Sequence, residues 1–360
     1  MSFMEKRKLR GVYVVTEPGC LRPTTGAFQH IQVGLKELSK HFSMRTYFPS
    51  VPQYAEEKET APLAAISVSV IPDQNKLAGG LRAILCLMRS VGRSLKILRS
   101  LQQDRPDFVY VRAQFLDLLP LFLRIANIPC FLEANGLQFE SRQKYYASFL
   151  QGINKKIESL VYSAAKYVFF VGSYGDYWQL KTKNWKNVEN GAASDFVAAF
   201  ADCKKTVDET IHLAFVARLM GYHNPQLLIS AIKGLEPAVR SRLCLHLIGC
   251  GLESIDSELK ADVKVINHGF LSRDELHKTL GSVHVGLIPG MPEYQSQMKL
   301  FDYGAAKCVA VVPNAHNLQF WFDDTEVEFF EAGSSQSLAK VLTNLVECPA
   351  LKLSKGERLY

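Results

Sequence analysis

The sequence predicts an α/β protein built from two Rossmann-like, doubly wound domains that face each other across a cleft. Short, β-prone apolar runs alternate with longer amphipathic segments, a pattern typical of parallel sheets covered on both faces by helices. The alternation occurs in two series, and the segment between them is polar and charged. A length of 360 residues also favours two hydrophobic cores over one.

The first series predicts six strands and four helices. The strands are expected at 11–16, 44–48, 65–71, 107–112, 130–134 and 167–171, and the helices at 26–40, 79–103, 115–126 and 143–164. An Asn190-Gly191 turn and a charged linker follow, and we place the domain boundary between residues 205 and 206.

The second series predicts five strands and five helices. The strands are expected at 212–217, 243–249, 263–266, 283–289 and 308–312, and the helices at 224–234, 252–260, 272–281, 298–306 and 334–346. Because ligands bind at the carboxyl ends of parallel strands in such sheets, the loops after these strands are where we expect the chemistry.

Composition and charge narrow the class of protein. The formal net charge of +7 favours anionic partners such as phosphorylated metabolites, nucleic acid or an acidic membrane surface. The eight cysteines are scattered without a CxxC pair, which favours reduced thiols over a disulfide or zinc framework. We find neither a clean apolar span of about 20 residues nor a signal-peptide cleavage pattern. The expected location is the cytoplasm, with peripheral attachment to the cytosolic face of the membrane as an option.

Residues 79–102 form a candidate amphipathic helix. One side of it is basic, with Arg82, Arg89, Arg93 and Lys96. The opposite side is apolar, with Leu87, Met88, Val91, Leu95 and Leu98. Either the helix packs on the sheet with a solvated basic face, or it contacts an acidic membrane. Because no aromatic residues are interleaved, nucleic-acid binding is disfavoured and we expect no nucleic-acid partner.

Two loops of the first domain carry candidate ligand groups. The loop after the first strand contains Gly26 at the start of a helix, where free amides suit an anion or a sugar hydroxyl, although a plain turn is the alternative. It lacks the GxGxxG pattern, which argues against a dinucleotide oxidoreductase. In FLEANG, Glu133 and Asn135 share one face of a strand end. They form either a structural hydrogen-bond pair, or a site in which Asn135 faces a polyhydroxylated ligand.

In the second domain, three segments place phosphate-binding groups at strand ends. Arg218 ends a strand, and arginine suits phosphate recognition, although a surface ion pair is the alternative. The LIGCG turn contains Gly249 and Gly251, which permit a ligand to approach the backbone. Lys299 and Asp302 share a helix face in SQMKLFDYGAA, so they form either a surface ion pair, or a nucleotide site with the lysine on phosphate and the aspartate on ribose hydroxyls.

Taken in order, these motifs resemble the GT-B-fold retaining glycosyltransferases of glycosyltransferase family 4. The resemblance rests on five blocks: the glycine loop followed by a helix with His30, IPCFLEANG, VENGAASDF, FVARL with LIGCG and HGFLSRDEL, and SQMKLFDYGAAKCVAVV. It implies transfer of a sugar from a nucleotide-sugar donor to a glycan or lipid-linked acceptor with retention of configuration. A product for the cell surface is the expectation by analogy. Residues 1–205 would bind the acceptor and residues 206–360 the donor.

The resemblance also implies a role for each matching residue. The donor-binding set is Gly26, His223, Gly249, Gly251, Glu293, Gln297, Met298 and Asp302. The catalytic set is Arg218, Lys299 and Asn135, and the acceptor-binding set is His30 and Glu133. No metal or other cofactor is expected, because basic side chains and helix amides would stabilise the departing nucleoside diphosphate. Retention in this family is ascribed to front-side attack, so no protein nucleophile is expected.

Several positions depart from the family pattern. His223 stands where many members have a phosphate-binding lysine, so either it binds as a cation or Lys299 supplies the charge. Asp302 replaces a longer glutamate, Ala193 replaces an acidic residue, and Glu293 is one position out of register. These departures leave two alternatives open: a non-catalytic GT-B-like binding subunit, and a sugar-nucleotide epimerase, for which His30, Glu133 and His223 offer no clear acid/base set.

Overall fold

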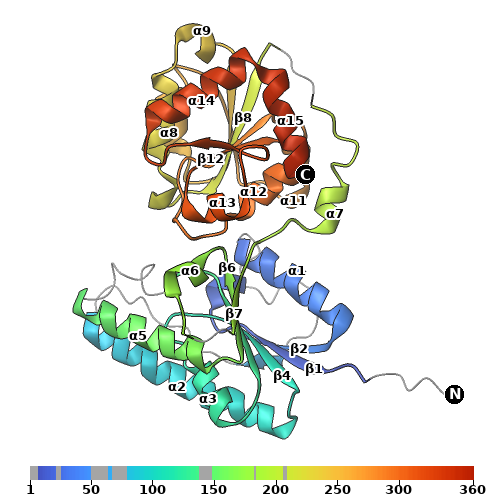
Figure 1. The fold of residues 1–360 in the computed structure, drawn as a ribbon, viewed down its shortest axis with the longest axis vertical. Helices are drawn as coiled ribbons and strands as arrows, with labels where there is room; N and C mark the ends of the chain where they lie inside the picture. Colours follow the sequence, from blue (N-terminus) through green and yellow to red (C-terminus); the bar gives the residue numbers. More distant parts are fainter. Residues whose placement is uncertain are drawn as a thin grey trace, which may run out of the picture. The chain divides into compact units, whose positions relative to one another are not determined.

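The chain folds into two compact units, Met1–Val188 and Glu189–Tyr360. The computed structural model describes residues 7–21, 26–49, 64–66, 79–137, 148–181, 184–205 and 209–360. Both units are α/β, and each contains one parallel sheet (Figure 1). The predicted fold class is therefore confirmed.

The first unit contains a seven-stranded parallel sheet with the order β3-β2-β1-β4-β5-β6-β7. The strands are β1 (Arg10–Val14), β2 (Ser43–Pro49), β3 (Ala64–Ile66), β4 (Phe108–Arg112), β5 (Cys130–Ala134), β6 (Tyr167–Val171) and β7 (Trp185–Val188). The helices are the 3-10 helix η1 (Pro18–Leu21), α1 (Gly26–His41), α2 (Gly79–Gln103), α3 (Leu119–Ile125), α5 (Ser148–Ala164) and α6 (Tyr174–Trp178). In Figure 1, α1 covers one face of the sheet, and α2, α3 and α5 cover the other.

The second unit contains a six-stranded parallel sheet with the order β10-β9-β8-β11-β12-β13. The strands are β8 (Ile211–Arg218), β9 (Leu243–Cys250), β10 (Lys264–Gly269), β11 (Val285–Leu287), β12 (Val309–Pro313) and β13 (Glu328–Phe330). The helices are α7 (Ser194–Ala198), the 3-10 helix η4 (Gly221–His223), α8 (Pro225–Lys233), α9 (Pro237–Arg240), α10 (Glu253–Leu259), α11 (Arg273–Gly281), α12 (Met298–Ala305), α13 (His316–Trp321), α14 (Ser335–Glu347) and α15 (Pro349–Leu359).

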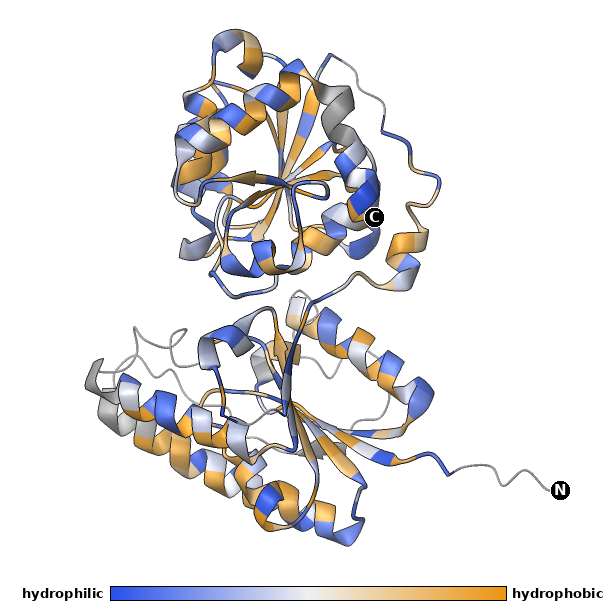
Figure 2. Ribbon diagram, viewed as in Figure 1, coloured by the Kyte–Doolittle hydropathy of each residue, from blue (hydrophilic) through white to orange (hydrophobic). Residues whose placement is uncertain are grey.

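Two apolar cores hold the second unit together, one on each face of its sheet. Side chains of α8, α10 and α14 pack against one face, and those of α7 and α12 pack against the other. Figure 2 shows the strands between them as largely hydrophobic. This burial on both faces explains why the strands read as unbroken apolar runs in the sequence.

The units divide between Val188 and Glu189, earlier than the boundary predicted after residue 205. The linker residues fold onto the second unit because Phe196 and Phe200 enter its core with 6% and 1% exposure. Lys205 adds two hydrogen bonds, from its ammonium group to the carbonyl oxygens of Leu280 at 2.6 Å and Gly281 at 3.0 Å. The polar segment that we predicted to be a linker therefore packs as part of the second unit.

The helix predicted at 79–103 is present as α2, but it packs through a different side. Its buried residues are Ser90, Ser94, Ile97 and Leu101. At 100° per residue, this side is rotated by roughly 100° from the predicted apolar stripe. The outer part of that stripe is exposed, with Met88 at 65% and Leu95 at 39%. Ser90 favours the observed packing because its hydroxyl accepts a hydrogen bond from the Leu118 amide at 2.8 Å.

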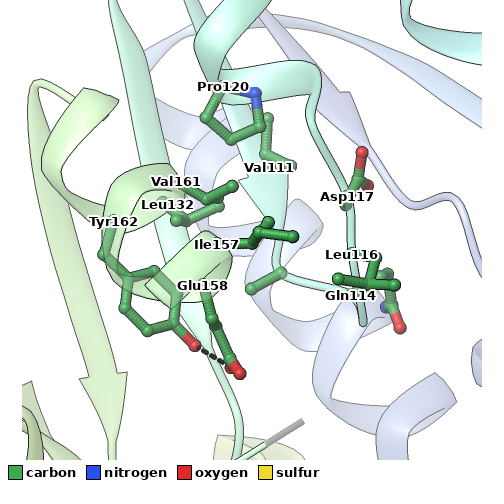
Figure 3. A pocket seen from close by; sticks show the side chains of 11 residues that line it. Val111, Gln114, Leu116, Asp117, Pro120, Leu132, Ile157, Glu158, Val161 and Tyr162 are labelled. Atoms are coloured by element: carbon green, nitrogen blue, oxygen red, sulfur yellow. Dashed lines mark hydrogen bonds between the residues drawn. The ribbon is translucent and has the colours of Figure 1, made fainter. Parts of the chain in front are cut away.

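A small cavity lies beneath α3 and α5 in the first unit. It is lined by Val111, Ala113, Gln114, Leu116, Asp117, Pro120, Leu132, Ile157, Glu158, Val161 and Tyr162 (Figure 3). The Tyr162 hydroxyl donates a hydrogen bond to Glu158 at 2.6 Å along one wall. The space holds about one water molecule, which is too little for a sugar or a nucleotide. The functional site is therefore expected at the carboxyl edges of the sheets.

Among the described helices, none combines the length and the apolar character that crossing a membrane requires.

Candidate functional site

The carboxyl ends of β8, β9 and β11 bring the predicted phosphate-binding residues of the second unit to one edge of its sheet. Arg218 is the last residue of β8, Gly249 lies at the end of β9, and α12 begins at Met298 after the loop that follows β11. Because neighbouring parallel strands end at the same edge, these groups share the position where ligands bind in open α/β sheets.

Lys299 is the most unusual group at this edge. Its ammonium nitrogen is buried and has no hydrogen-bond partner, and it forms no ion pair with any residue in the described ranges. It lies 5.5 Å from the ring centroid of Phe215. Burial lowers the pKa of Lys299 to about 7. A buried cation without a counter-charge is costly, so the arrangement points to an anion that completes the site when bound.

His223 lies beside Lys299 but does not add a second cation. Its Nδ1 accepts a hydrogen bond from the Met220 amide at 3.1 Å, which fixes that nitrogen as an acceptor. Burial, with the positive charge of Lys299, lowers the pKa of His223 to about 4. The imidazole is therefore neutral at pH 7. Of the two alternatives for the missing family lysine, the structure favours Lys299 as the source of positive charge.

Two further donors at the same edge lack partners within the described part of the chain. Arg218 is exposed, and no hydrogen bond or ion pair holds its guanidinium group. Gln297, the residue that precedes α12, is buried, and its side-chain nitrogen Nε2 has no acceptor. Its side chain also leaves the start of α12 uncapped. Together with Lys299, these groups place hydrogen-bond donors from two segments at one sheet edge, where an anionic ligand is favoured.

Gly249 and Gly251 are required by the backbone itself. Gly249 has φ +132°, and a Cβ there would lie 1.9 Å from the carbonyl oxygen of Ala217 on β8. Gly251 has φ +78°, which also favours glycine. The loop after β11 contains a third glycine, Gly290. A Cβ added there would lie only 2.5 Å from the carbonyl oxygen of Tyr222. The glycines thus shape the edge by close strand and loop contacts.

Asp302 does not pair with Lys299, so the surface ion pair that was one of the two alternatives for them is not formed. Its carboxylate binds the Arg273 guanidinium at 2.8 Å. Arg273, the first residue of α11, also lies 3.5 Å from the ring centroid of Phe196. Burial raises the pKa of Asp302, and Arg273 opposes this shift. The resemblance implies that Asp302 binds the ribose hydroxyls. It would do so with one carboxylate oxygen already paired with Arg273.

A polar cluster that the sequence analysis missed lies next to Gln297. The Asn190 amide group donates to the Ser296 hydroxyl at 2.6 Å, and the Asn317 amide group donates to Glu189 at 3.0 Å. Burial raises the pKa of Glu189 to about 7, despite hydrogen bonds from Asn190 and Asn317. The only signal in the sequence was the VENG turn, whose partners are more than a hundred residues away. Glu293, from the predicted cradle loop, is exposed.

In the first unit, Glu133 is the centre of a buried hydrogen-bond network. Its carboxylate, 3% exposed at the residue level, accepts hydrogen bonds from Tyr110 at 2.8 Å and Asn135 at 2.6 Å. His30 Nε2 lies 3.1 Å away, and Arg112 forms a short ion pair. Burial raises the pKa of Glu133, but Arg112 and His30 outweigh it and hold the pKa far below its ordinary value.

This network decides how the predicted acceptor residues are arranged. Glu133 and Asn135 do form the hydrogen-bond pair that was one of the two alternatives. Glu133 is enclosed and fully used, whereas His30 on α1 keeps 23% of its side chain exposed. Gly26 is the first residue of α1, as expected. The carboxylate therefore fixes the positions of His30 and Asn135 at this sheet edge.

Solved structures share this architecture over nearly the whole chain. Sucrose-phosphate synthase from Thermosynechococcus elongatus matches with a TM-score of 0.75 at 13% identity, covering 98% of this chain and 93% of that one. HepE from Anabaena, solved with UDP and glucose, matches with a TM-score of 0.68 at 12% identity and the coverage is 98% and 93%. The chain has the GT-B fold. By sequence, no family model and no curated protein matches it.

Other GT-B neighbours carry different activities in their names. WaaG, a glycosyltransferase involved in lipopolysaccharide biosynthesis, matches with a TM-score of 0.63 at 11% identity, covering 97% of this chain and 94% of that one. A protein from Listeria monocytogenes described as a UDP-N-acetylglucosamine 2-epimerase matches with a TM-score of 0.61 at 10% identity, with coverage of 98% and 91%. The GT-B fold therefore leaves the activity to be argued from the site.

Proposed function

We propose that the chain is a glycosyltransferase that moves a sugar from a nucleotide-sugar donor to a glycan or lipid-linked acceptor. The single observation that carries the proposal is the buried, unpartnered ammonium group of Lys299, at the same sheet edge as the exposed guanidinium of Arg218. Two cations at the carboxyl edge of a parallel sheet suit a diphosphate, which carries charge enough to offset both. HepE, which shares the fold, was solved with UDP and with UDP-glucose.

In this proposal, the second unit stabilises the leaving group. As the bond between the sugar and the diphosphate breaks, negative charge develops on the phosphate oxygens. Arg218 and Lys299 stabilise that charge, and the Gln297 amide and the amides that begin α12 donate hydrogen bonds to it. These groups supply the positive charge at the site, so we propose no resident metal for the transfer step. Glu293, Met298 and the 249–251 turn border the sugar and the base, and Asp302 contacts the ribose.

The first unit binds the acceptor in this proposal. His30 and Asn135 supply the polar groups that face the acceptor hydroxyls, and Glu133 is a positioning residue. The transfer retains the configuration of the sugar by front-side attack, in which the departing phosphate oxygen helps to deprotonate the acceptor hydroxyl and no carboxylate nucleophile is needed. We place the enzyme in the cytoplasm, or peripherally on the cytosolic membrane face, in the synthesis of cell-surface polysaccharide.

The test is a calorimetric screen of UDP-, GDP-, ADP-, CMP- and dTDP-sugars. At least one sugar nucleotide should bind, and Arg218→Ala and Lys299→Ala should each weaken it about tenfold or more, because a hydrogen bond to a charged group contributes about 1.5–3 kcal/mol. Lys340→Ala is the matched control, since Lys340 is an exposed lysine of α14. If no nucleotide binds, the proposal fails.

The alternatives give different results once a donor binds. A transferase releases the nucleoside diphosphate only when acceptor is supplied, apart from slow hydrolysis. A non-catalytic GT-B-like subunit, the second candidate suggested by the neutral His223, binds the donor but never consumes it. A sugar-nucleotide epimerase converts the sugar without any acceptor. Product analysis by anion-exchange chromatography, with and without acceptor extracts, separates the three.

A further inference from the structure

Four of the nine histidines in the chain meet in the second unit, away from the proposed donor edge. They are His212 on β8, His246 on β9, His268 on β10 and His284 just before β11. Cys244 joins them from β9. Histidine is uncommon in buried sheet positions, and His246, His284 and Cys244 are all buried. The His284 ring accepts a hydrogen bond from the His212 amide at 3.0 Å, and the proposed transfer reaction uses none of these side chains.

The sheet geometry brings three ligand atoms together. Cys244 and His246 are two residues apart on β9, so their side chains point to the same face. His212 is the register partner of Cys244 on the adjacent strand β8. The His212 Nδ1 atom lies 2.8 Å from His246 Nε2, and Cys244 Sγ lies 3.8 Å from the same nitrogen. One atom from each of the three residues falls within 4.8 Å of the others.

We propose that His212, Cys244 and His246 form a zinc site. Two imidazoles and a thiolate are ligands that Zn²⁺ prefers, with metal–nitrogen distances near 2.0–2.1 Å and a metal–sulfur distance near 2.3 Å. Ligand atoms of a tetrahedral ion are then roughly 3.3–3.6 Å apart, compared with 2.8 Å between the two ring nitrogens and 3.8 Å between His246 Nε2 and Cys244 Sγ here. The fourth position is open to water. At about 3.3 Å per strand residue, His212 is roughly 20 Å from Arg218, so the site is separate from the donor edge.

His268 adds the outer contact that histidine ligands generally have. Its Nε2 lies 2.9 Å from His246 Nδ1, the nitrogen that does not face the metal position. With the proton of His246 on Nδ1, donated to His268, the Nε2 lone pair is left for zinc. A register shift in β10 between Asn267 and Gly269 occurs at this residue, and bulges of this kind re-aim side chains.

The protons balance in this arrangement. Cys244 loses its thiol proton to solvent when the metal–sulfur bond forms, which releases one proton per ion. His212 binds through Nδ1 with its proton on Nε2, and His246 binds through Nε2 with its proton on Nδ1. The hydrogen bond between His212 and His246 is replaced by two metal–nitrogen bonds. Neither redox chemistry nor a further reactant is involved.

The test uses full-length protein stripped of metal with a chelator and titrated with Co²⁺, followed by Zn²⁺. We expect about one Co²⁺ per chain, a thiolate-to-cobalt charge-transfer band and intense visible bands typical of tetrahedral cobalt, all lost when Zn²⁺ displaces the ion. The absence of the charge-transfer band in the unmutated protein overturns the proposal. That result does not depend on whether any variant folds.

Variants assign the ligands. Cys244→Ser should remove the charge-transfer band, whereas Cys250→Ser, at an exposed cysteine outside the cluster, should leave it unchanged. His268→Asn should keep the band and weaken binding about 10–100-fold, as expected for an outer-shell residue. Retention of the band in Cys244→Ser, or its loss in Cys250→Ser, overturns the assignment. Mass spectrometry of the zinc-loaded protein under non-denaturing conditions gives an independent count.

Discussion

At the scale of single residues, Lys299 links stability to pH. Burial lowers its pKa from 10.5 to about 7 in the folded chain. Between these values the unfolded chain carries the proton and the folded chain does not, so stability rises with pH across that window. Below about pH 7 both states carry it, and the full cost of the buried charge remains. This cost in stability is expected for a lysine whose charge is neutralised only when an anion binds.

Replacement of this charge should stabilise the free protein. Lys299→Met shortens the side chain by one atom and removes the buried ammonium, so the free energy of unfolding at pH 7 should rise by about 1–4 kcal/mol, the range seen when buried ion pairs are replaced by apolar groups. Urea denaturation followed by circular dichroism measures it. Lys340→Met on α14 should change little. A loss of stability in Lys299→Met indicates a stabilising partner that contradicts our interpretation.

Nucleotide binding should also take up a proton. A bound diphosphate restores the charge of Lys299, so above pH 7 binding draws a proton from the buffer and affinity falls as pH rises. With the tightest nucleotide sugar from the screen, calorimetry at pH 8 in Tris and in HEPES should give an uptake approaching one proton, and much less at pH 6. Lys299→Ala should abolish the uptake, whereas His223→Ala, which removes a neutral ring, should preserve it. An uptake that follows His223 instead reverses the assignment.

The sequence predicted which residues stand at strand ends, but not their partners. Local patterns located four of the site residues, because a polar residue at the end of an apolar run can be recognised from the sequence alone. These residues are Arg218, Lys299, Glu133 and Asn135. The pairing of Asp302 with Arg273 joins two helices, and the contact of Glu189 with Asn317 spans more than a hundred residues. Such contacts depend on tertiary packing, which no local pattern encodes.

At the scale of elements, the close approach of β9 to β8 at their carboxyl ends depends on Gly249. Gly249→Ala should destabilise the protein by more than about 1 kcal/mol, because its Cβ meets the Ala217 carbonyl oxygen and its φ of +132° disfavours other residues. Gly281→Ala, at the end of α11 where an added Cβ meets nothing within 4 Å, is the control and should cause no loss. Thermal melts compare the two. Equal stability of both variants contradicts the close contact.

The exposed apolar side of α2 gives a second prediction at this scale. Met88 and Leu95 lie among the exposed basic residues Arg89, Lys96 and Arg99, a combination that suits an acidic membrane surface. Full-length protein should sediment with phosphatidylglycerol vesicles and much less with phosphatidylcholine vesicles. The double variant Met88→Glu with Leu95→Glu should lose this binding, whereas Phe270→Glu, at an exposed phenylalanine of the second unit, should retain it. Equal binding of all three proteins excludes this role for α2.

Most long elements were predictable, and the short ones were not. α1, α2, α12 and β9 match their expected ranges within about a residue, because their periodicity is sustained. Two strands were missed, β7 with four residues and β13 with three. Each is a strand because it pairs with a neighbouring strand of the sheet. The packed side of α2 was missed because its serines, which read as polar, make the buried contacts.

At the scale of the whole molecule, the placement of α7 predicts which fragment folds. A fragment of residues 189–360 retains Phe196 and Phe200 in the second core, and a fragment of residues 206–360 lacks both. Burial of one such side chain contributes roughly 1.5–3 kcal/mol, so the longer fragment should be clearly more stable. Circular dichroism melts of the two fragments decide it. Matching melting temperatures contradict the assignment of residues 189–205 to the second unit.

The unpaired ammonium of Lys299 has a consequence for selectivity. A point charge on a flexible stem responds to the charge of a ligand and not to its identity. Inorganic phosphate or pyrophosphate will therefore occupy the same position, and a phosphate buffer will mask nucleotide binding. In the proposed function the 249–251 turn borders the base, so we expect discrimination among bases to come from the groups around it. Exchange of that turn between GT-B proteins should change which nucleotide binds most tightly, while the affinity for inorganic phosphate stays the same.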